Sequence, residues 1–411
     1  MVGKMRLRGL TALCGALLLV VSSFVLADIE QARLDAIAAD LQARVDEGRL
    51  AGAVALVAQD GEIQMNEAFG HRNVEDGVVM TTDTIFRIFS MTKPVAGTAL
   101  MILHDEGKFE LDDPVGEYIP ELADLRVFKS QRDDGSFETE AAGHAMTIRE
   151  LMSHTGGLVY TPPLSQGPVA QAYAQAGILG RETTLAEMAD ALDDIPLNHQ
   201  PGTQWVYSIS VDVQGYLIEV LSGQTFDRFL KERIFTPLGM RDTGFHVVPE
   251  KADRLSRQYA PVQGTLRRTD TGAFLQEPKF FSGGGGLTST AADYMKFAQM
   301  HLNGGVLAGE RILSEEAVAI MRSNHLPEGI SDIGQLYPGN VFGVDFAVVD
   351  NPDLWNGAPA GTHWWWGIAG TWFWIDPVND IIFVGMIQND DIFYSLQVAA
   401  KMRDLIYRPL E

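Results

Sequence analysis

The chain of 411 residues contains almost no cysteine: Cys14 is the only one, and it lies in an apolar segment near the N-terminus. If that segment is removed, the mature chain has no disulfide, no thiol nucleophile and no thiolate metal site. The histidines are scattered, with neither an H-E-x-x-H motif nor an H-x-H pair, which disfavours a zinc hydrolase. The G-x-S-x-G elbow of α/β-hydrolases is also missing.

The N-terminal segment has the pattern of a secretory signal peptide. Three basic residues come first, namely Lys4, Arg6 and Arg8. The apolar run 10–26 follows, and small residues up to Ala27 then provide a cleavage site before Asp28. We expect residues 1–27 to be removed and the mature chain to be periplasmic or secreted. A membrane anchor is the alternative, but the run is short and interrupted by serines.

The charge of the chain is strongly acidic. Losing the three basic residues of the signal lowers the formal charge from −23 to about −26. This disfavours nucleic acid and anionic membranes as partners. At 46% hydrophobic residues the chain can bury a large core, and no motif implies a cofactor.

The order of periodic segments predicts an α+β fold. An amphipathic helix is expected over 29–50, and two strands over 51–70 turn at Asp60-Gly61. Near the other end, the patterns at 340–350, 370–380 and 381–390 are typical of strands, and that at 394–407 of a helix. We therefore expect an antiparallel sheet built from both termini and flanked by helices, with an inserted, mostly helical domain.

The expected boundaries place 28–105 and 280–411 in the sheet domain and 106–279 in the insertion. Within the insertion, the acidic, glycine-bearing stretch 129–145 is expected to be a surface loop.

Ser90 and Lys93 form an S-x-x-K motif where a strand-like run gives way to a helical pattern. Residues three apart share one face of a helix, so the Lys93 amine can approach the Ser90 hydroxyl. A serine hydroxyl becomes a good nucleophile once a nearby group takes its proton. The alternative is an N-cap serine followed by a surface lysine, but no other serine in the chain precedes a lysine by three.

Further segments make the pattern specific. They are "LMSHTGGL" at 151–158, "QPGTQWVYSISVDVQGYLIEVLSG" at 200–223, "FFSGGGGLTSTAADYMKFAQMHLNGG" at 280–305 and "WWWGIAGTWFWIDP" at 364–377. With the S-x-x-K motif, they resemble the serine β-lactamase/penicillin-binding-like superfamily. The likeness is greatest to its class C-like branch with the family VIII carboxylesterases, and it covers nearly the whole chain after about residue 28. The resemblance implies the same fold, with the site between the sheet and the insertion.

The resemblance implies a third catalytic residue, Tyr207. In those families a tyrosine at this place pairs with the lysine and shuttles the proton of the nucleophile. An adjacent ammonium would favour the ionised phenol. The alternative is an aromatic side chain packed between domains. Penicillin-binding members carry Asn or Ser two positions later, whereas Ile209 stands there in this chain.

The resemblance also bears on the substrate. Where β-lactamases have K-T-G, this chain has Trp365-Trp366-Gly367, similar to the W-x-G form of the esterases. An indole in place of an ammonium favours a neutral, apolar group over an anionic one. We expect these three residues to line the substrate pocket, although strand alternation turns at least one tryptophan away from it. The backbone N–H groups of Ser90 and Ile368 are the expected oxyanion hole.

Two other features are not expected to take part in the chemistry. The stretch 283–286 has four glycines and no P-loop lysine, so it is expected to be a loop bordering the site. His154 is expected to be a hydrogen-bonded turn residue.

The sequence thus predicts a serine hydrolase that cleaves short-chain carboxylic esters, with a small-molecule ester as partner and no membrane span in the mature chain. The alternatives are a β-lactamase or D-Ala-D-Ala carboxypeptidase, a penicillin-binding or sensor module with little turnover, and a transacylase.

Overall fold

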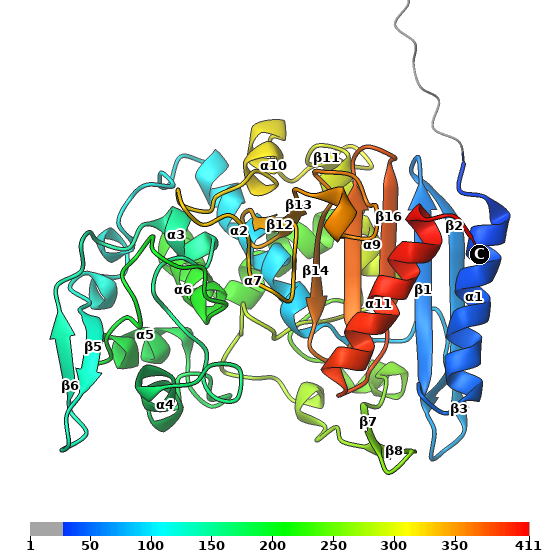
Figure 1. Ribbon diagram of the computed structural model, residues 1–411, viewed down its shortest axis with the longest axis horizontal. Coiled ribbons are helices and arrows are strands. Elements are labelled where there is room, and N and C mark those ends of the chain that lie inside the picture. The colour runs from blue at the N-terminus through cyan, green and yellow to red at the C-terminus, as the bar shows by residue number, and fades with distance from the viewer. Residues whose placement is uncertain (1–27, 411) are drawn as a thin grey trace, which may run out of the picture.

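The computed structural model describes residues 28–410, so the predicted signal segment 1–27 lies outside the described residues. Among residues 28–410, no helix is both long and apolar enough to span a bilayer. A large antiparallel sheet with helices on both faces occupies one side of the molecule, and a mostly helical region extends from it (Figure 1).

The described part of the chain contains one eight-stranded sheet, in the order β12-β13-β14-β15-β16-β1-β2-β3. The strands are β1 (Gly52–Gln59), β2 (Glu62–Asn73), β3 (Val78–Val79), β12 (Asn340–Phe342), β13 (Ala347–Val349), β14 (His363–Gly367), β15 (Thr371–Asp376) and β16 (Ile381–Met386). Neighbouring strands are antiparallel, and β1 pairs directly with β16. The two ends of the chain therefore meet in one sheet, which confirms the predicted fold class.

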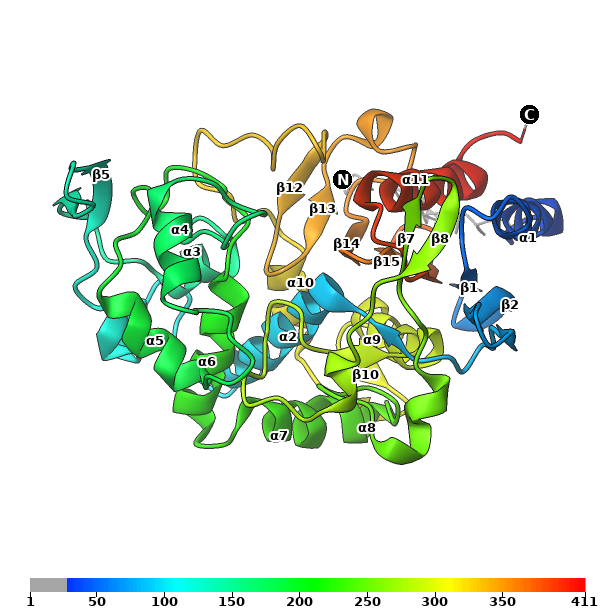
Figure 2. The same cartoon turned by 90° about the horizontal axis from the view of Figure 1, so that it is seen from below.

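Helices cover both faces of this sheet. On one face lie α1 (Gln31–Asp46) and α11 (Ile392–Tyr407), which contact each other (Figure 2). On the other face α9 (Ala291–Leu302) packs against β1, β15 and β16. Every residue of β1, β15 and β16 is buried. Apolar side chains on both faces of these strands explain why their sequences are almost continuously hydrophobic.

The helical region lies beyond α2 (Thr92–Asp105), which joins it to the sheet. Its helices are α3 (Ile148–Met152), α4 (Pro168–Gln175), α5 (Leu185–Asp193), α6 (Ser210–Ser222), α7 (Phe226–Leu230), α8 (Thr236–Leu238) and α10 (Glu315–Met321). A π-helical turn, Lys231–Phe235, joins α7 to α8. The core of this region is the packing of α2 against α6.

Two hairpins lie within the range predicted as an insertion. The first, β5 (Val127–Gln131) with β6 (Phe137–Glu140), projects from the far end of the helical region (Figure 1). The prediction of a plain surface loop over 129–145 was wrong. The two strands are mostly part-exposed, and their sequences lack the regular apolar alternation that would have indicated strands. The second, β7 (Tyr259–Val262) with β8 (Thr265–Arg268), lies beside α11 and the sheet (Figure 2).

The turns of the sheet follow from local sequence. Asp60 and Gly61 both have positive φ, 52° and 77°, as a two-residue hairpin turn between right-twisted strands requires. The stretch 340–350, predicted as one strand, is instead the two short strands β12 and β13. Asp345 lies between them at φ 56°.

The end of β14 fits closely against the segment η1 (Phe89–Met91), which follows β4 (Phe86–Arg87). A Cβ on Gly367 would overlap the carbonyl oxygen of Ile88 and the hydroxyl oxygen of Thr371. That hydroxyl donates a hydrogen bond to the same carbonyl at 3.2 Å. Gly367 was expected to line the substrate pocket. The side of its Cα that would carry a Cβ is occupied by the chain's own backbone.

Gly367→Ala should therefore destabilise the protein by about 1–3 kcal/mol, the usual range for an added methyl in a well-packed site. Urea unfolding followed by circular dichroism measures the change. Gly143→Ala is the matched control, because a Cβ there would meet only the Gln200 side chain at 3.7 Å. Equal stability of the two variants would contradict this packing role.

Candidate active site

Ser90 lies in η1, directly before α2, and is partly exposed. Phe89 precedes it at φ 41°, a left-handed conformation that residues with side chains rarely adopt. The buried Tyr294 hydroxyl on α9 donates to the carbonyl of Met91 at 2.9 Å, which ties this turn to the sheet domain. Such local strain persists only where the surrounding structure fixes it, and it is common at active sites.

The amine of Lys93 is within hydrogen-bond distance of the Ser90 hydroxyl, with Nζ 3.2 Å from Oγ. Lys93 has no exposed surface. Its Nζ also donates to the Tyr160 hydroxyl at 2.8 Å and to the Gly284 carbonyl at 2.6 Å. Burial lowers the pKa of Lys93 to about 7, although the carboxylates of Asp212 and Asp345 act in the opposite direction.

Tyr207 joins this pair from the segment before α6. The Lys93 ammonium nitrogen lies 4.5 Å from the centre of the Tyr207 ring. The phenol oxygen accepts a hydrogen bond from Trp365 Nε1 at 3.2 Å and is also hydrogen-bonded to Ser90. Burial raises the pKa of Tyr207 above its usual range, although both hydrogen bonds act to lower it. The pKa of the phenol is thus shifted in the direction opposite to that expected from a neighbouring ammonium.

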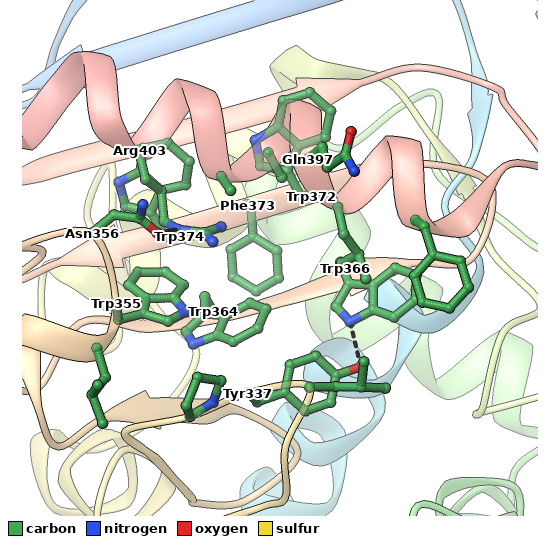
Figure 3. A pocket seen from close by; sticks show the side chains of 17 residues that line it. Tyr337, Trp355, Asn356, Trp364, Trp366, Trp372, Phe373, Trp374, Gln397 and Arg403 are labelled. Atoms are coloured by element: carbon green, nitrogen blue, oxygen red, sulfur yellow. Dashed lines mark hydrogen bonds between the residues drawn. The ribbon is translucent and has the colours of Figure 1, made fainter.

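The structure thus brings Ser90, Lys93 and Tyr207 together, but it separates the tryptophans. Trp365 is only 1% exposed and lies behind Tyr207, where it also packs against Phe342 at 5.5 Å. Trp366 points to the opposite face of the sheet, as strand alternation requires. Its Nε1 donates to the Tyr337 hydroxyl at 3.0 Å, and it lines a cavity beneath α11 (Figure 3). Trp366 is therefore not placed beside Ser90.

Ile368 directly follows β14, at the end that packs against η1. Its backbone N–H and that of Ser90 therefore belong to two segments in contact. The close fit at Gly367 fixes their relative position.

Three buried residues around Lys93 were missed by the sequence analysis: Tyr160, Asp212 and Asp345. Asp212 Oδ1 accepts hydrogen bonds from Ser282 Oγ at 2.6 Å and from the Gly284 N–H at 3.0 Å. The only signal for the two aspartates was a single acid within an otherwise apolar run, "SVDVQGYLI" and "FGVDFAVV". Tyr160 carried no signal of its own.

The glycine-rich stretch 283–286 borders the site closely. A Cβ on Gly283 would overlap the Val211 carbonyl, and one on Gly284 would lie 2.6 Å from Asp212 Oδ2. The absence of side chains lets this loop bring its carbonyl to Lys93.

His154 lies in a turn at φ 58° and is buried. Its Nδ1 accepts a hydrogen bond from the Ser208 N–H at 3.2 Å, and its ring lies 5.0 Å from that of Tyr207. Burial lowers the pKa of His154 well below its usual range, so the neutral ring supports Tyr207. Within residues 28–410, no cluster of three or more His, Cys, Asp or Glu side chains could hold a metal ion.

Comparisons with known proteins agree with this geometry. The Beta-lactamase family model matches residues 37–403. An uncharacterised protein of Mycobacterium tuberculosis is 37% identical, over 87% of this chain and 90% of that protein. Esterase EstB of Burkholderia gladioli is 32% identical, over 82% of this chain and 88% of its own length. The solved structure of EstCE1, described as a hydrolase with promiscuous acyltransferase activity, superposes with a TM-score of 0.76 at 27% identity, covering 92% of this chain and 99% of that one. The chain belongs to the Beta-lactamase family.

Proposed function

We propose that this protein is a serine esterase that cleaves small neutral carboxylic esters through an acyl-enzyme on Ser90. The observation that carries the proposal is the Lys93 amine, 3.2 Å from the Ser90 hydroxyl, with a pKa near 7. A base whose pKa lies close to neutral pH is well matched to removing a proton from an attacking hydroxyl.

The hydrogen bonds of Lys93 suit the neutral amine as well as the ammonium. The Gly284 carbonyl can only accept, so one N–H is directed to it, and Tyr160 can accept a second. The lone pair of the neutral amine is then free to accept the Ser90 proton. After the transfer, the ammonium has three acceptors: Gly284, Tyr160 and the Ser90 oxygen.

The reaction then runs in two halves. Ser90 Oγ forms a bond to the ester carbonyl carbon as its proton passes to Lys93, and the oxyanion is stabilised by the Ser90 and Ile368 N–H groups. The carbon–oxygen bond to the alcohol breaks, and the alcohol leaves with the proton relayed through Tyr207. Water then attacks the acyl group, gives its proton to the same pair, and releases Ser90.

The substrate preference rests on the lack of a fixed cation in β14, whose sequence His363–Gly367 contains no lysine or arginine. The aromatic rings of Tyr160 and Trp205 both lie close to that of Tyr207, at centroid distances of 5.3 and 6.2 Å. Aromatic rings beside a strand that carries no lysine or arginine favour a neutral acyl group over the carboxylate of a β-lactam or peptide terminus. The esterase relative EstB supports the same preference.

Acyl transfer to an alcohol is the second candidate, supported by these aromatic rings, which would slow the approach of water to the acyl-enzyme. Addition of 1-butanol to a p-nitrophenyl butyrate reaction separates the two. Butyl butyrate as the main product indicates a transacylase, and butyrate indicates a hydrolase.

The direct test compares p-nitrophenyl butyrate with nitrocefin and a D-Ala-D-Ala peptide, using kcat/KM for each. We expect the ester to be preferred by at least about tenfold, equivalent to ~1.4 kcal/mol. Equal or better turnover of nitrocefin would contradict the proposal. A stable acyl adduct without turnover, seen by intact-protein mass spectrometry, would indicate a binding or sensor module instead.

Ser90→Ala should reduce kcat by about 10⁴–10⁶, as expected for loss of the nucleophile from a cooperating set of residues. Lys93→Ala and Tyr207→Phe should each be nearly as damaging, and the double variant should be little worse than either. Steady-state kinetics on folded protein, checked by circular dichroism, measures these losses. Retention of more than a few percent of the activity by Ser90→Ala would remove Ser90 from the mechanism.

The kcat/KM for p-nitrophenyl butyrate should rise with pH through about 7, because the Lys93 ammonium cannot accept a proton below its pKa. Asp212→Asn keeps an oxygen acceptor for Ser282 and Gly284 but removes a negative charge that favours the ammonium. Its midpoint should therefore lie at lower pH than that of the wild type. A midpoint that does not move would assign the transition to another group.

Trp365→Phe should lower kcat by about five- to tenfold, because it removes one hydrogen bond, worth ~1 kcal/mol, from the Tyr207 oxygen. Trp366→Phe is the matched control: it removes an equivalent indole hydrogen bond, that to Tyr337, on the opposite face of the same strand. It should change kcat less than twofold. Equal effects of the two substitutions would mean that strand packing, not the bond to Tyr207, determines the rate.

A further inference from the structure

The outer face of the sheet holds a cavity of about 360 Å³ between β14, β15 and α11 (Figure 3). Indoles form much of its lining: those of Trp355, Trp364, Trp366, Trp372 and Trp374. Trp365 faces Tyr207 while Trp364 and Trp366 line this cavity, and none of Ser90, Lys93 and Tyr207 belongs to its lining. The proposed esterase mechanism uses none of it.

Arg403 enters this aromatic setting from α11. Its guanidinium carbon lies 4.2 Å from the centre of the Trp355 ring and 5.8 Å from that of Trp364. Among residues 28–410, no carboxylate oxygen lies within 4.0 Å of its nitrogens, and its one hydrogen bond is from Nε to Asn356 Oδ1 at 3.4 Å. Burial lowers the pKa of Arg403 to about 10, which still leaves it charged at neutral pH.

The nearest acid in sequence, Asp404, is engaged elsewhere. Its Oδ1 accepts a hydrogen bond from Asn356 Nδ2 at 2.6 Å and lies 3.5 Å from Nε of Arg408. Arg403 is half-buried, and a charged group partly withdrawn from water is ordinarily paired. Arg403 therefore retains unused capacity for an anion.

The mouth of the cavity is apolar. Leu336, Leu354 and Phe393 are 65%, 54% and 69% exposed, and all three belong to its lining. Large exposed hydrophobic side chains gathered around one hollow are typical of ligand-binding sites. The apolar rim and the indole walls suit a ligand with an apolar body, and the single cation suits a ligand with one anionic group.

We propose that this cavity binds a small organic anion with a flat apolar body, an aromatic carboxylate in chemical class, with the carboxylate on Arg403 and the ring between the indoles. A guanidinium binds a carboxylate through two parallel N–H donors, and the two terminal nitrogens of Arg403 make no hydrogen bond within residues 28–410. Aromatic rings pack favourably against the indole faces. A volume near the lower end for ligand pockets limits the ligand to one or two fused rings.

The test uses isothermal titration calorimetry with 2-naphthoate and its neutral isostere 2-naphthamide. The wild-type protein should bind the anion about tenfold or more tightly than the amide, since a hydrogen-bonded charge contact contributes about this factor. Arg403→Met should remove that difference while leaving amide binding unchanged. Lys401→Met removes a positive charge from an exposed position on the same helix and should change neither affinity.

Two further variants fix the location. Ala400→Phe fills the cavity while keeping Arg403, and it should abolish binding of both probes even if Arg403→Met fails to fold. Ser90→Ala should bind both probes as the wild type does, because the catalytic side of the sheet is not involved. The proposal is overturned if the wild type binds neither probe or both equally. It is also overturned if Arg403→Met retains the preference for the anion, if Ala400→Phe binds normally, or if Ser90→Ala loses binding.

Discussion

Lys93 places an amine in the protein core at the start of α2, where no solvent reaches it. The next ten residues of that helix, Pro94 to Leu103, are buried as well, so the amine cannot turn outward to water. Withdrawing an ammonium from water is costly unless the group finds partners or loses its proton. Here both occur: three acceptors surround Nζ, and burial lowers the pKa of the amine to about 7.

The surroundings of the site follow from accommodating that amine. Gly284 brings a carbonyl to Nζ only because a loop without side chains can pass so close to Asp212 and Val211. Gly97, one turn along α2 from Lys93, leaves space for the Asp345 carboxylate, whose Oδ2 would lie 2.6 Å from a Cβ there. Glycine inside a helix is destabilising, so its presence at this position indicates that the approach of Asp345 matters. The two acids moderate the loss of charge on Lys93 without pairing with it directly.

The sequence alone predicts the structure correctly where the deciding contacts are local. Ser90 and Lys93 lie within one helical turn, and Asp60 with Gly61 specifies a hairpin by itself. It failed where contacts are distant along the chain: Tyr160 meets Lys93 across 67 residues, and nothing near Tyr160 indicates this. It placed both Trp365 and Trp366 in the substrate pocket, whereas only Trp365 contacts Tyr207. Both faces of the sheet are covered by helices, so the side chains of Trp365 and Trp366 are both apolar. The period-two alternation of a strand shows that they lie on opposite faces, but it does not show which face lies next to Ser90. The hairpin at 127–140 was missed because most of its strand residues are only partly exposed and the strands show no regular alternation of buried and exposed side chains.

The alternation of β14 gives one short strand two tasks. Trp365 holds the phenol of Tyr207 on one face, and Trp364 and Trp366 form walls of the aromatic cavity on the other. The same strand ends at Gly367, whose backbone lies against Ile88 and so holds this end of β14 against η1, the segment that contains Ser90. A close-packed strand moves as a unit, because shifting one side chain displaces the backbone that carries its neighbours. The indoles beneath α11 therefore help to hold the strand end that meets Ser90.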